Sequence, residues 1–310
     1  MSRITDPVRT RLHSERLHYA TGELLGADDF RDEQTYHRRQ LSRALLYLHG
    51  SGVIAGLRVV ANHQAGRNGA PDEVELEVKP GLALDRVGRL IEVPREACLR
   101  LRRWFDFGAS RDPRDEDSDD EILDRDDLRL AWRADAGIDR GGAVVADVFL
   151  AFHPCDRGYT PAFASGPFDA LDASQPSRVR DAHELTLAPR TEPDAELQNQ
   201  IGFDHWAGIT GATPGARLAS DRERSLDAWG ALTPPAQNHA GNFRENPPGV
   251  DPTAVLLARL RLPSAAAPQV TSAPIADWSA TAWPNANANL DLDVRNYLFP
   301  LAALRRIAGI

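Results

Sequence analysis

Cysteine is scarce in this 310-residue chain, which contains only Cys98 and Cys155. Two thiols are too few for a disulfide framework or for a structural zinc site built on thiolates. We therefore interpret both as free thiols and expect neither a bound metal nor a cofactor.

Long apolar runs are also missing. The opening residues contain no apolar stretch of the kind that a secretory leader requires, and no window reaches the roughly 20 residues of a membrane-spanning helix. We expect a cytoplasmic protein without a membrane span.

Positive charge is in deficit. The chain has 36 Lys and Arg against 45 Asp and Glu, a formal net charge of −9, and a single lysine, Lys79. Proteins that bind nucleic acid cluster basic side chains against the phosphates. We therefore expect no nucleic-acid partner.

Proline and glycine, at 22 and 23 residues, are frequent enough to favour many turns over long helices. We predict a mainly β fold, with a β-sandwich or barrel-like core, one long N-terminal α-helix and long irregular loops. The expected organisation is an N-terminal segment at 1–60, a β core at 61–188 with an acidic loop at 111–127, and a loop-rich region at 189–310 that returns a core strand near 255–262.

The helix is predicted over 28–49. Acidic residues crowd its first turns and arginines its later ones, as the helix dipole favours, and Gly50 stands where a C-cap glycine belongs. One face repeats at intervals of three and four residues, and we expect it to pack against the β core. Its residues are Phe30, Gln34, His37, Leu41, Ala44, Leu45 and Leu48.

Alternating and β-branched residues predict the strands. The stretch from 53 to 60 is an incoming strand, and 73–94 contains a hairpin whose turn runs from Asp85 to Gly88. Further strands are expected at 98–101, 128–132, 144–153, 183–187 and 255–262. The stretches 111–127, 189–252 and 263–292 are expected to be irregular excursions.

The run from Gly50 to Ala55 fits G-x-G-x-x-G/A, the glycine pattern of dinucleotide-binding loops. In that fold the glycines follow a strand and open a helix, so that the helix amides face the phosphates. Here they close a helix and open a strand. We therefore interpret them as a helix cap and a tight crossing.

Ten carboxylates lie between residues 112 and 127. Asp115, Asp117 and Asp119 fit the first places of a calcium loop, but Asp120 replaces its glycine and Asp126 its final glutamate. We expect a solvated loop that binds no calcium.

His153 and Cys155 would share one face of a strand end, where they could begin a metal site or a thiol nucleophile with its base. Nothing else at matching spacing supports either role, so we interpret them as structural. Four tryptophans fall in the expected excursions, where they either pack onto the core or form an interface. These candidate interface residues are Trp206, Trp229, Trp278 and Trp283.

Residues 24–94 contain three short patterns. The first consists of Asp29-Phe30, Glu33-Gln34 and Tyr36; the second of Leu48-His49-Gly50, Gly52-Val53, Gly56-Leu57 and Val59; the third of Pro80-Gly81, Ala83, Asp85, Gly88, Ile91 and Val93. With these patterns the chain resembles a group of bacterial proteins encoded in gene clusters for phage-tail-like contractile injection systems. Weaker similarity covers 177–187 and 255–262, and Ser51 stands where that group has an aromatic residue.

The resemblance implies a structural or accessory component of the baseplate or tail tip, whose partners are other protein subunits of a particle that can be released from the cell. It supplies no catalytic residue, and we favour a non-enzymatic role. Self-association into a homo-oligomer stays open. The alternative is a β-sandwich carbohydrate-binding protein, or a glycan or ester hydrolase, that uses loop tryptophans and carboxylates.

Overall fold

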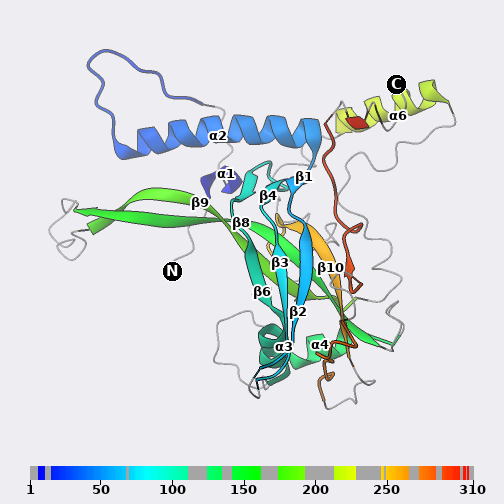
Figure 1. Ribbon diagram of the computed structural model, residues 1–310. Helices are drawn as coiled ribbons and strands as arrows, with labels where there is room; N and C mark the ends of the chain where they lie inside the picture. The colour runs from blue at the N-terminus through cyan, green and yellow to red at the C-terminus, as the bar shows by residue number, and fades with distance from the viewer. Residues whose placement is uncertain are drawn as a thin grey trace.

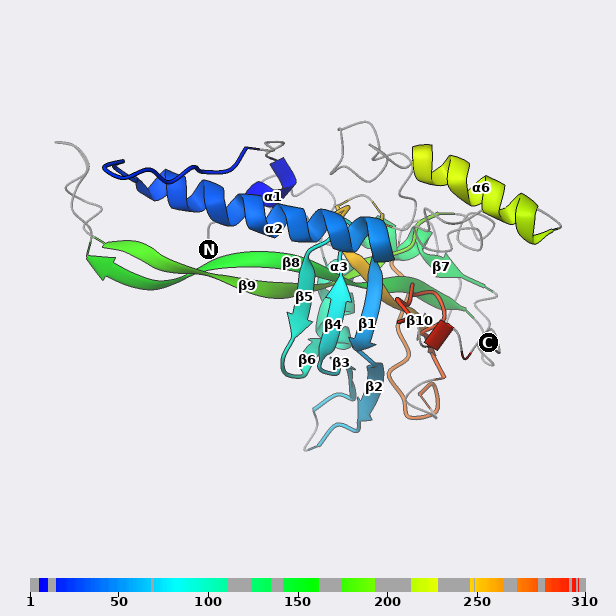
Figure 2. The ribbon, with the colours of Figure 1, turned by 90° about the horizontal axis from the view of Figure 1, so that it is seen from above.

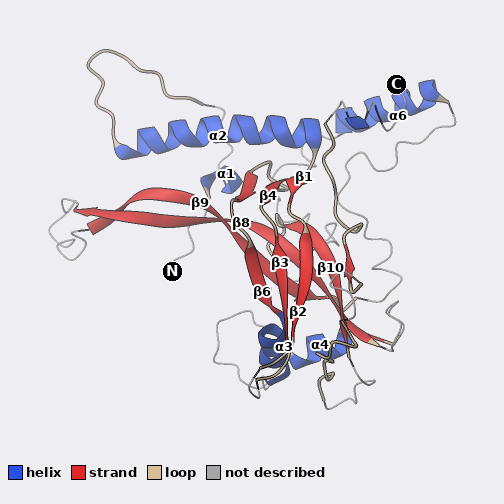
Figure 3. Ribbon diagram, viewed as in Figure 1, coloured by secondary structure: helices blue, strands red, loops and turns tan. Residues whose placement is uncertain are grey.

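The computed structural model describes residues 6–10, 15–67, 70–110, 124–134, 142–161, 174–192, 213–227, 246–247, 249–264, 272–283, 288–300, 303–304 and 306. The described chain is mainly β, as predicted, with antiparallel sheets surrounded by a few helices (Figures 1 and 3).

The described strands form three antiparallel sheets. The first small sheet has the order β1-β4-β5, with β1 at Gly52–Gly56, β4 at Gly81–Leu84 and β5 at Leu90–Val93. The second has the order β2-β3-β6, at Val59–Gln64, Glu73–Val78 and Ala97–Arg100. The large sheet has the order β11-β10-β8-β7, at Leu290–Asp291, Val255–Pro263, Ala143–Pro161 and Trp132–Arg133, and β9 at Ser174–Pro189 also pairs with β8.

The chain crosses between the two small sheets at one tight point. Gly56 and Leu57 both have positive φ, at 67° and 53°, and the Leu57 amide donates to the Pro80 carbonyl at 3.2 Å. A Cβ on Gly56 would lie 2.2 Å from that carbonyl oxygen, so only glycine fits. Gly56, which directly follows the glycine pattern at 50–55, therefore serves a tight backbone crossing, while Gly50 of that pattern caps α2.

One hydrophobic core joins the sheets. Val53 and Ile91 of the first small sheet, Leu76 of the second, and Val148 and Leu257 of the large sheet belong to the same buried cluster. Helix α3 (Leu101–Ser110) and the short α4 (Arg125–Leu130) close one end of this core with Phe105 and Leu128 (Figure 1). The small sheets and the large sheet thus share a single interior.

Two sequence predictions about secondary structure are wrong. Residues 128–132 were expected as a strand, but Asp124 caps α4 by accepting from the Asp126 amide at 3.2 Å, and only Trp132 and Arg133 pair as β7. The excursion at 189–252 contains helix α6 (Pro214–Asp227). Local capping outweighed the apolar pattern in the first case.

The long helix α2 spans Ala27–His49, within one residue of its predicted start. It is not the first element, because α1 (Pro7–Thr10) and the segment 15–26 precede it. The Gly26 amide donates to the Asp29 carboxylate at 2.7 Å, and Gly50, at φ 76°, donates its amide to the Leu46 carbonyl at 2.8 Å. The cap at Gly50 confirms the sequence prediction, and the contact between Gly26 and Asp29 caps the other end.

The predicted packing face of α2 is wrong. Phe30, Leu41 and Leu48 are 49%, 58% and 72% exposed, and the opposite side, with Thr35, Arg39, Ser42 and Leu46, is buried. Gly88 explains the choice, since a Cβ there would lie 2.0 Å from the Ser42 carbonyl oxygen. The turn at Gly88 therefore approaches the α2 backbone at Ser42, and the stripe with Phe30, Leu41 and Leu48 faces away from the body.

Strands β8 and β9 continue beyond the body as a two-stranded arm. β8 pairs with β10 only from Ala143 to Leu150, whereas its register with β9 runs out to Pro161 opposite Ser174. The arm, defined here as residues 153–161 and 174–182, projects to the same side as α2 (Figures 1 and 2).

Candidate functional site

Arg89 is the centre of a buried charge cluster that joins distant parts of the chain. Its guanidinium donates to Asp85 at 2.7 Å, to Asp6 at 3.1 Å and to Thr253 at 3.0 Å, and it stacks over the Phe152 ring at 4.5 Å. Burial acts to lower the pKa of Arg89, but Asp85 and Asp6 outweigh it and the pKa is raised. The cation is therefore fixed in place.

Asp85 holds the β4–β5 turn from inside. Its carboxylate accepts the amides of Val87 and Arg89 at 2.9 and 2.8 Å in addition to the Arg89 side chain. Asp6, a further member of the cluster, accepts hydrogen bonds from both terminal nitrogens of Arg38 on α2, each at 3.2 Å. The turn, α1 and α2 are thus joined by charge-assisted hydrogen bonds.

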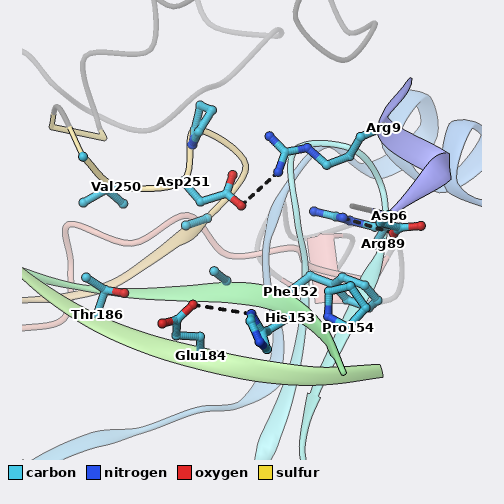
Figure 4. Close-up of a pocket in the computed structure, with 14 residues that line it drawn as sticks. Asp6, Arg9, Arg89, Phe152, His153, Pro154, Glu184, Thr186, Val250 and Asp251 are labelled. Atoms are coloured by element: carbon cyan, nitrogen blue, oxygen red, sulfur yellow. Dashed lines mark hydrogen bonds and ion pairs between the residues drawn. The ribbon is translucent and has the colours of Figure 1, made fainter. Parts of the chain in front are cut away.

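A pocket of about 450 Å³ opens where the arm leaves the body (Figure 4). Its visible polar groups face one another in pairs: Arg9 with Asp251 at 3.1 Å, and His153 with Glu184 at 3.7 Å. The lining residues are Asp6, Arg9, Arg89, Ala151, Phe152, His153, Pro154, Glu184, Thr186, Gly249, Val250, Asp251, Pro252 and Ala254.

The chemistry of this pocket is that of matched charges. Arg9 faces Asp251 and Arg89 faces Asp6, so these two arginines do not offer the concentrated positive field that a phosphate requires. Walls of both signs suit a polar chain segment better. The pocket lies at the root of the arm and has charges of both signs in its wall.

The residues of the three sequence patterns have two kinds of role. Those from Gly50 to Gly88 shape the backbone at a helix cap, at close crossings and at a turn. Gly50 caps α2, Gly52 lies against the Asn296 carbonyl, Gly56 packs on Pro80, Gly81 packs on Ala55 and Leu57, Asp85 holds the turn, and Gly88 lies against α2.

The pattern residues on α2 lie at its start and on its surface. Asp29 caps the start, Glu33 accepts a hydrogen bond from the Tyr19 hydroxyl, and Tyr36 packs edge-on to His37. The side chains of Phe30, Gln34 and His49 are exposed.

The tryptophans do not gather into a surface platform in the described structure. Trp278 and Trp283 are buried in the main core, where Trp278 meets Phe105 edge-on at 6.1 Å. Their burial does not fit the interface role proposed for them and agrees with the packing alternative. Trp206 and Trp229 lie outside the described residues.

His153 and Cys155 do not form a metal or nucleophile site in the described structure. His153 lies against Glu184, and the described part of the chain holds no group of three or more His, Cys, Asp or Glu side chains suited to a metal. Cys98 and Cys155 are both free thiols. Most of the acidic stretch, 111–123, lies outside the described residues, and Asp124–Asp127 begin α4.

Two exposed surfaces were not predicted: the outward face of α2 and the arm. Sequence spacing did find the apolar face of α2, but it gave no sign of which side of the helix meets the body. The arm was missed because only 144–153 and 183–187 carry apolar strand patterns, while its outer residues show no regular apolar alternation.

Comparisons with known proteins add no relative. No model of a protein family matches the chain, and no curated protein matches it either. Among the described helices, none combines the length and apolar character needed to cross a bilayer.

Proposed function

We propose that this protein is a non-enzymatic component of a phage-tail-like contractile injection particle and acts through protein–protein contacts. Its resemblance to proteins of such gene clusters supports the kind of particle, and the shape of the molecule supports the mode of action. On this proposal the protein is made in the cytoplasm and assembled there at the baseplate or tail tip.

The arm carries the proposal. A two-stranded ribbon outside a core is at best marginally stable in water, because few apolar contacts offset its ordering entropy. Within the described residues, Tyr159 is 70% and Val179 58% exposed on opposite strands of this ribbon. An arm of this kind gains its stabilisation when a neighbouring subunit packs against it or pairs with its edge.

The core class is part of the same proposal. The small sheets lie over the large one, and we assign a β-sandwich or barrel-like core on the basis of their shared interior. Such a scaffold can hold an arm at a fixed angle to its neighbours.

The carbohydrate or hydrolase alternative has less support. It relied on loop tryptophans, and Trp278 and Trp283 are buried in the core. The carboxylates Asp6 and Asp251 at the pocket are engaged by Arg89 and Arg9, which leaves them poorly placed to exchange protons with a substrate. No observation favours that function over assembly.

Shortening the arm tests the proposal. Residues 157–178 are replaced by Asn-Gly, which closes a two-residue turn between the paired Asp156 and Val179. We expect a folded protein, with a melting temperature within about 5 °C of the parent, that no longer co-purifies with particles from its host.

A matched control is Ile275→Ser, which removes an exposed apolar side chain far along the chain from the arm. This variant should still co-purify with the particle. Retention of the shortened protein would refute the role of the arm, and absence of the wild-type protein from purified particles would refute the particle assignment itself.

A further inference from the structure

Three arginines gather on one face of the arm. In the register of β8 with β9, Arg157 lies directly opposite Arg178, and Arg180 lies opposite Cys155, two residues closer to the body. Because successive residues of a strand point to opposite faces, these three side chains share one face. Directly opposite residues have Cβ atoms about 5 Å apart, and alternate residues of one strand follow at about 7 Å. We call Arg157, Arg178 and Arg180 the basic face.

The basic face has no neutralising partner in the described structure. All three arginines are exposed, and none has an ion pair or a side-chain hydrogen bond within the described part of the chain. The next carboxylate along this face belongs to Glu184, four residues further along β9, and it lies 3.7 Å from His153. The two aspartates of the arm, Asp156 and Asp181, lie on its other face.

This arrangement costs the isolated protein stability. Like charges that lie directly opposite on two strands repel each other, and Arg157 and Arg178 do so on a two-stranded ribbon, which is marginally stable by itself. A partner that lays carboxylates over the basic face removes this repulsion. It also gains charge-assisted hydrogen bonds, which arginine can form with both oxygens of a carboxylate. The basic face therefore suits a negatively charged partner.

Charge and spacing favour an acidic protein over a nucleic acid as this partner. The chain as a whole carries a formal net charge of −9, which repels a polyphosphate at long range. Three cations also fall short of the roughly 6–10 phosphate contacts that give such complexes their affinity. An extended protein segment with a carboxylate at every second residue repeats at about 7 Å, which is the spacing of Arg178 and Arg180 along β9.

We infer that the basic face binds an extended acidic segment of a neighbouring protein subunit, one that presents carboxylates at alternate positions. The inference rests on the proposed function, because it assigns a chemistry to the neighbour that the arm contacts. Its test uses the purified full chain and a synthetic probe, so the inference can fail while the particle assignment stands, and the reverse.

The probe is a fluorescent peptide of about 12 residues in which Thr and Glu alternate. It is titrated with the full chain at about 50 mM salt and followed by fluorescence anisotropy, and we expect a Kd below about 1 mM. Raising the salt to about 300 mM should weaken binding several-fold, because exposed ion pairs are screened. A wild-type chain that does not bind this peptide, or that binds the corresponding Thr/Gln peptide equally well, would overturn the inference.

Charge-matched variants locate the contact. Arg157→Gln, Arg178→Gln and Arg180→Gln together remove the basic face and should raise the Kd at least about fivefold. The control variant loses the same charge at three exposed positions outside the arm and should keep the parental Kd: Arg67→Gln, Arg103→Gln and Arg222→Gln. Equal losses in the two variants would contradict a contact on the arm. A third variant guards against misfolding, because lysine at the arm positions keeps the charge and should bind at least about threefold more tightly than glutamine there: Arg157→Lys, Arg178→Lys and Arg180→Lys.

Two further measurements distinguish other occupants of the basic face. A labelled DNA duplex of about 20 base pairs should bind more weakly than the acidic peptide at the same salt, and tighter binding that the arm glutamine variant abolishes would show a nucleic-acid site instead. Sedimentation velocity of the chain alone at up to about 100 µM tests a second copy, and self-association that the same variant abolishes would show that the chain's own carboxylates occupy the face. Either result would overturn the inference. Absence of the wild-type protein from purified particles would refute the particle assignment and leave the peptide result unaffected.

Discussion

Asp85 has a role out of proportion to its size. It is fully buried, and it satisfies two backbone amides of the β4–β5 turn while neutralising Arg89. Removing one partner of a buried ion pair is costly because the other charge stays desolvated. This carboxylate therefore stabilises both the turn and the contact that Gly88 of the turn makes with α2.

We predict that Asp85→Ala lowers the free energy of unfolding by about 3–5 kcal/mol, because it removes one of the two carboxylates that neutralise the buried Arg89 and leaves two turn amides without their acceptor. Urea denaturation followed by circular dichroism measures the change. Glu92→Ala, on the exposed side of β5 in the same hairpin, serves as the control and should cost less than about 0.5 kcal/mol. Equal losses for both variants would show that the buried pair does not stabilise the fold.

At the scale of residues, the sequence revealed the turn but not its surroundings. Asp85 and Gly88 fit a turn by type and spacing alone, and the turn is there. Their tertiary partners, Asp6, Ser42 and Thr253, come from remote parts of the chain. A turn can be predicted because it depends on the types of a few neighbouring residues. The partners of a buried ion pair cannot, because they depend on how the whole chain folds.

Among the secondary-structure elements, helix α2 shows which features the sequence predicts and which it does not. Its bounds and caps were predictable because charge, spacing and Gly50 act locally. Its orientation was not, because the larger apolar stripe is the usual core face and here a close contact with Gly88 selects the side with Thr35 and Ser42. An apolar stripe indicates burial against something, and in this chain the described body is not what it meets.

A pair of leucines on α2 distinguishes the two faces. Leu46, 2% exposed, packs toward the body, so Leu46→Ala should lower the free energy of unfolding by about 2–5 kcal/mol. Leu41→Ala, at a side chain that is 58% exposed, should cost less than about 0.5 kcal/mol. The opposite order of losses would restore the packing face expected from spacing.

The acidic stretch can be divided at Asp124. We expect residues 112–123 to be replaceable by a Gly/Ser linker with little change in melting temperature, and millimolar calcium to have no effect on it, because the calcium-loop glycine and glutamate are missing. Extending the replacement through 127 removes the Asp124 cap of α4 and should cost about 0.5–2 kcal/mol. Differential scanning calorimetry with and without calcium compares the two, and a calcium-dependent rise in the parent would contradict the assignment.

At the scale of the whole molecule, the C-terminal third belongs to the same structure as the first. β10 supplies Leu257 and Leu260 to the core, and Trp278 and Trp283 join it from the stretch that the sequence presented as an excursion. Asp147 of β8 accepts from Arg259 of β10 at 2.8 and 2.9 Å, in a fully buried position. The sequence did not predict this packing role, because the many small residues and prolines of 263–292 are typical of a surface loop.

This sharing leads to a prediction about cooperativity. Because Val53, Leu76 and Trp283, drawn from all three predicted segments, lie in one buried cluster, none of the segments holds a complete core of its own. We expect thermal unfolding followed by tryptophan fluorescence and by far-ultraviolet circular dichroism to give one coincident transition at monomer concentration. A fragment of residues 61–188 should fail to fold, and deletion of 263–292 should unfold the rest, because the loss of Trp283 alone costs about 3–5 kcal/mol in such a core. A fragment 61–188 with its own cooperative melt, or two separated transitions in the full chain, would show instead that the segments are independent units and that the arm and α2 are carried by different bodies.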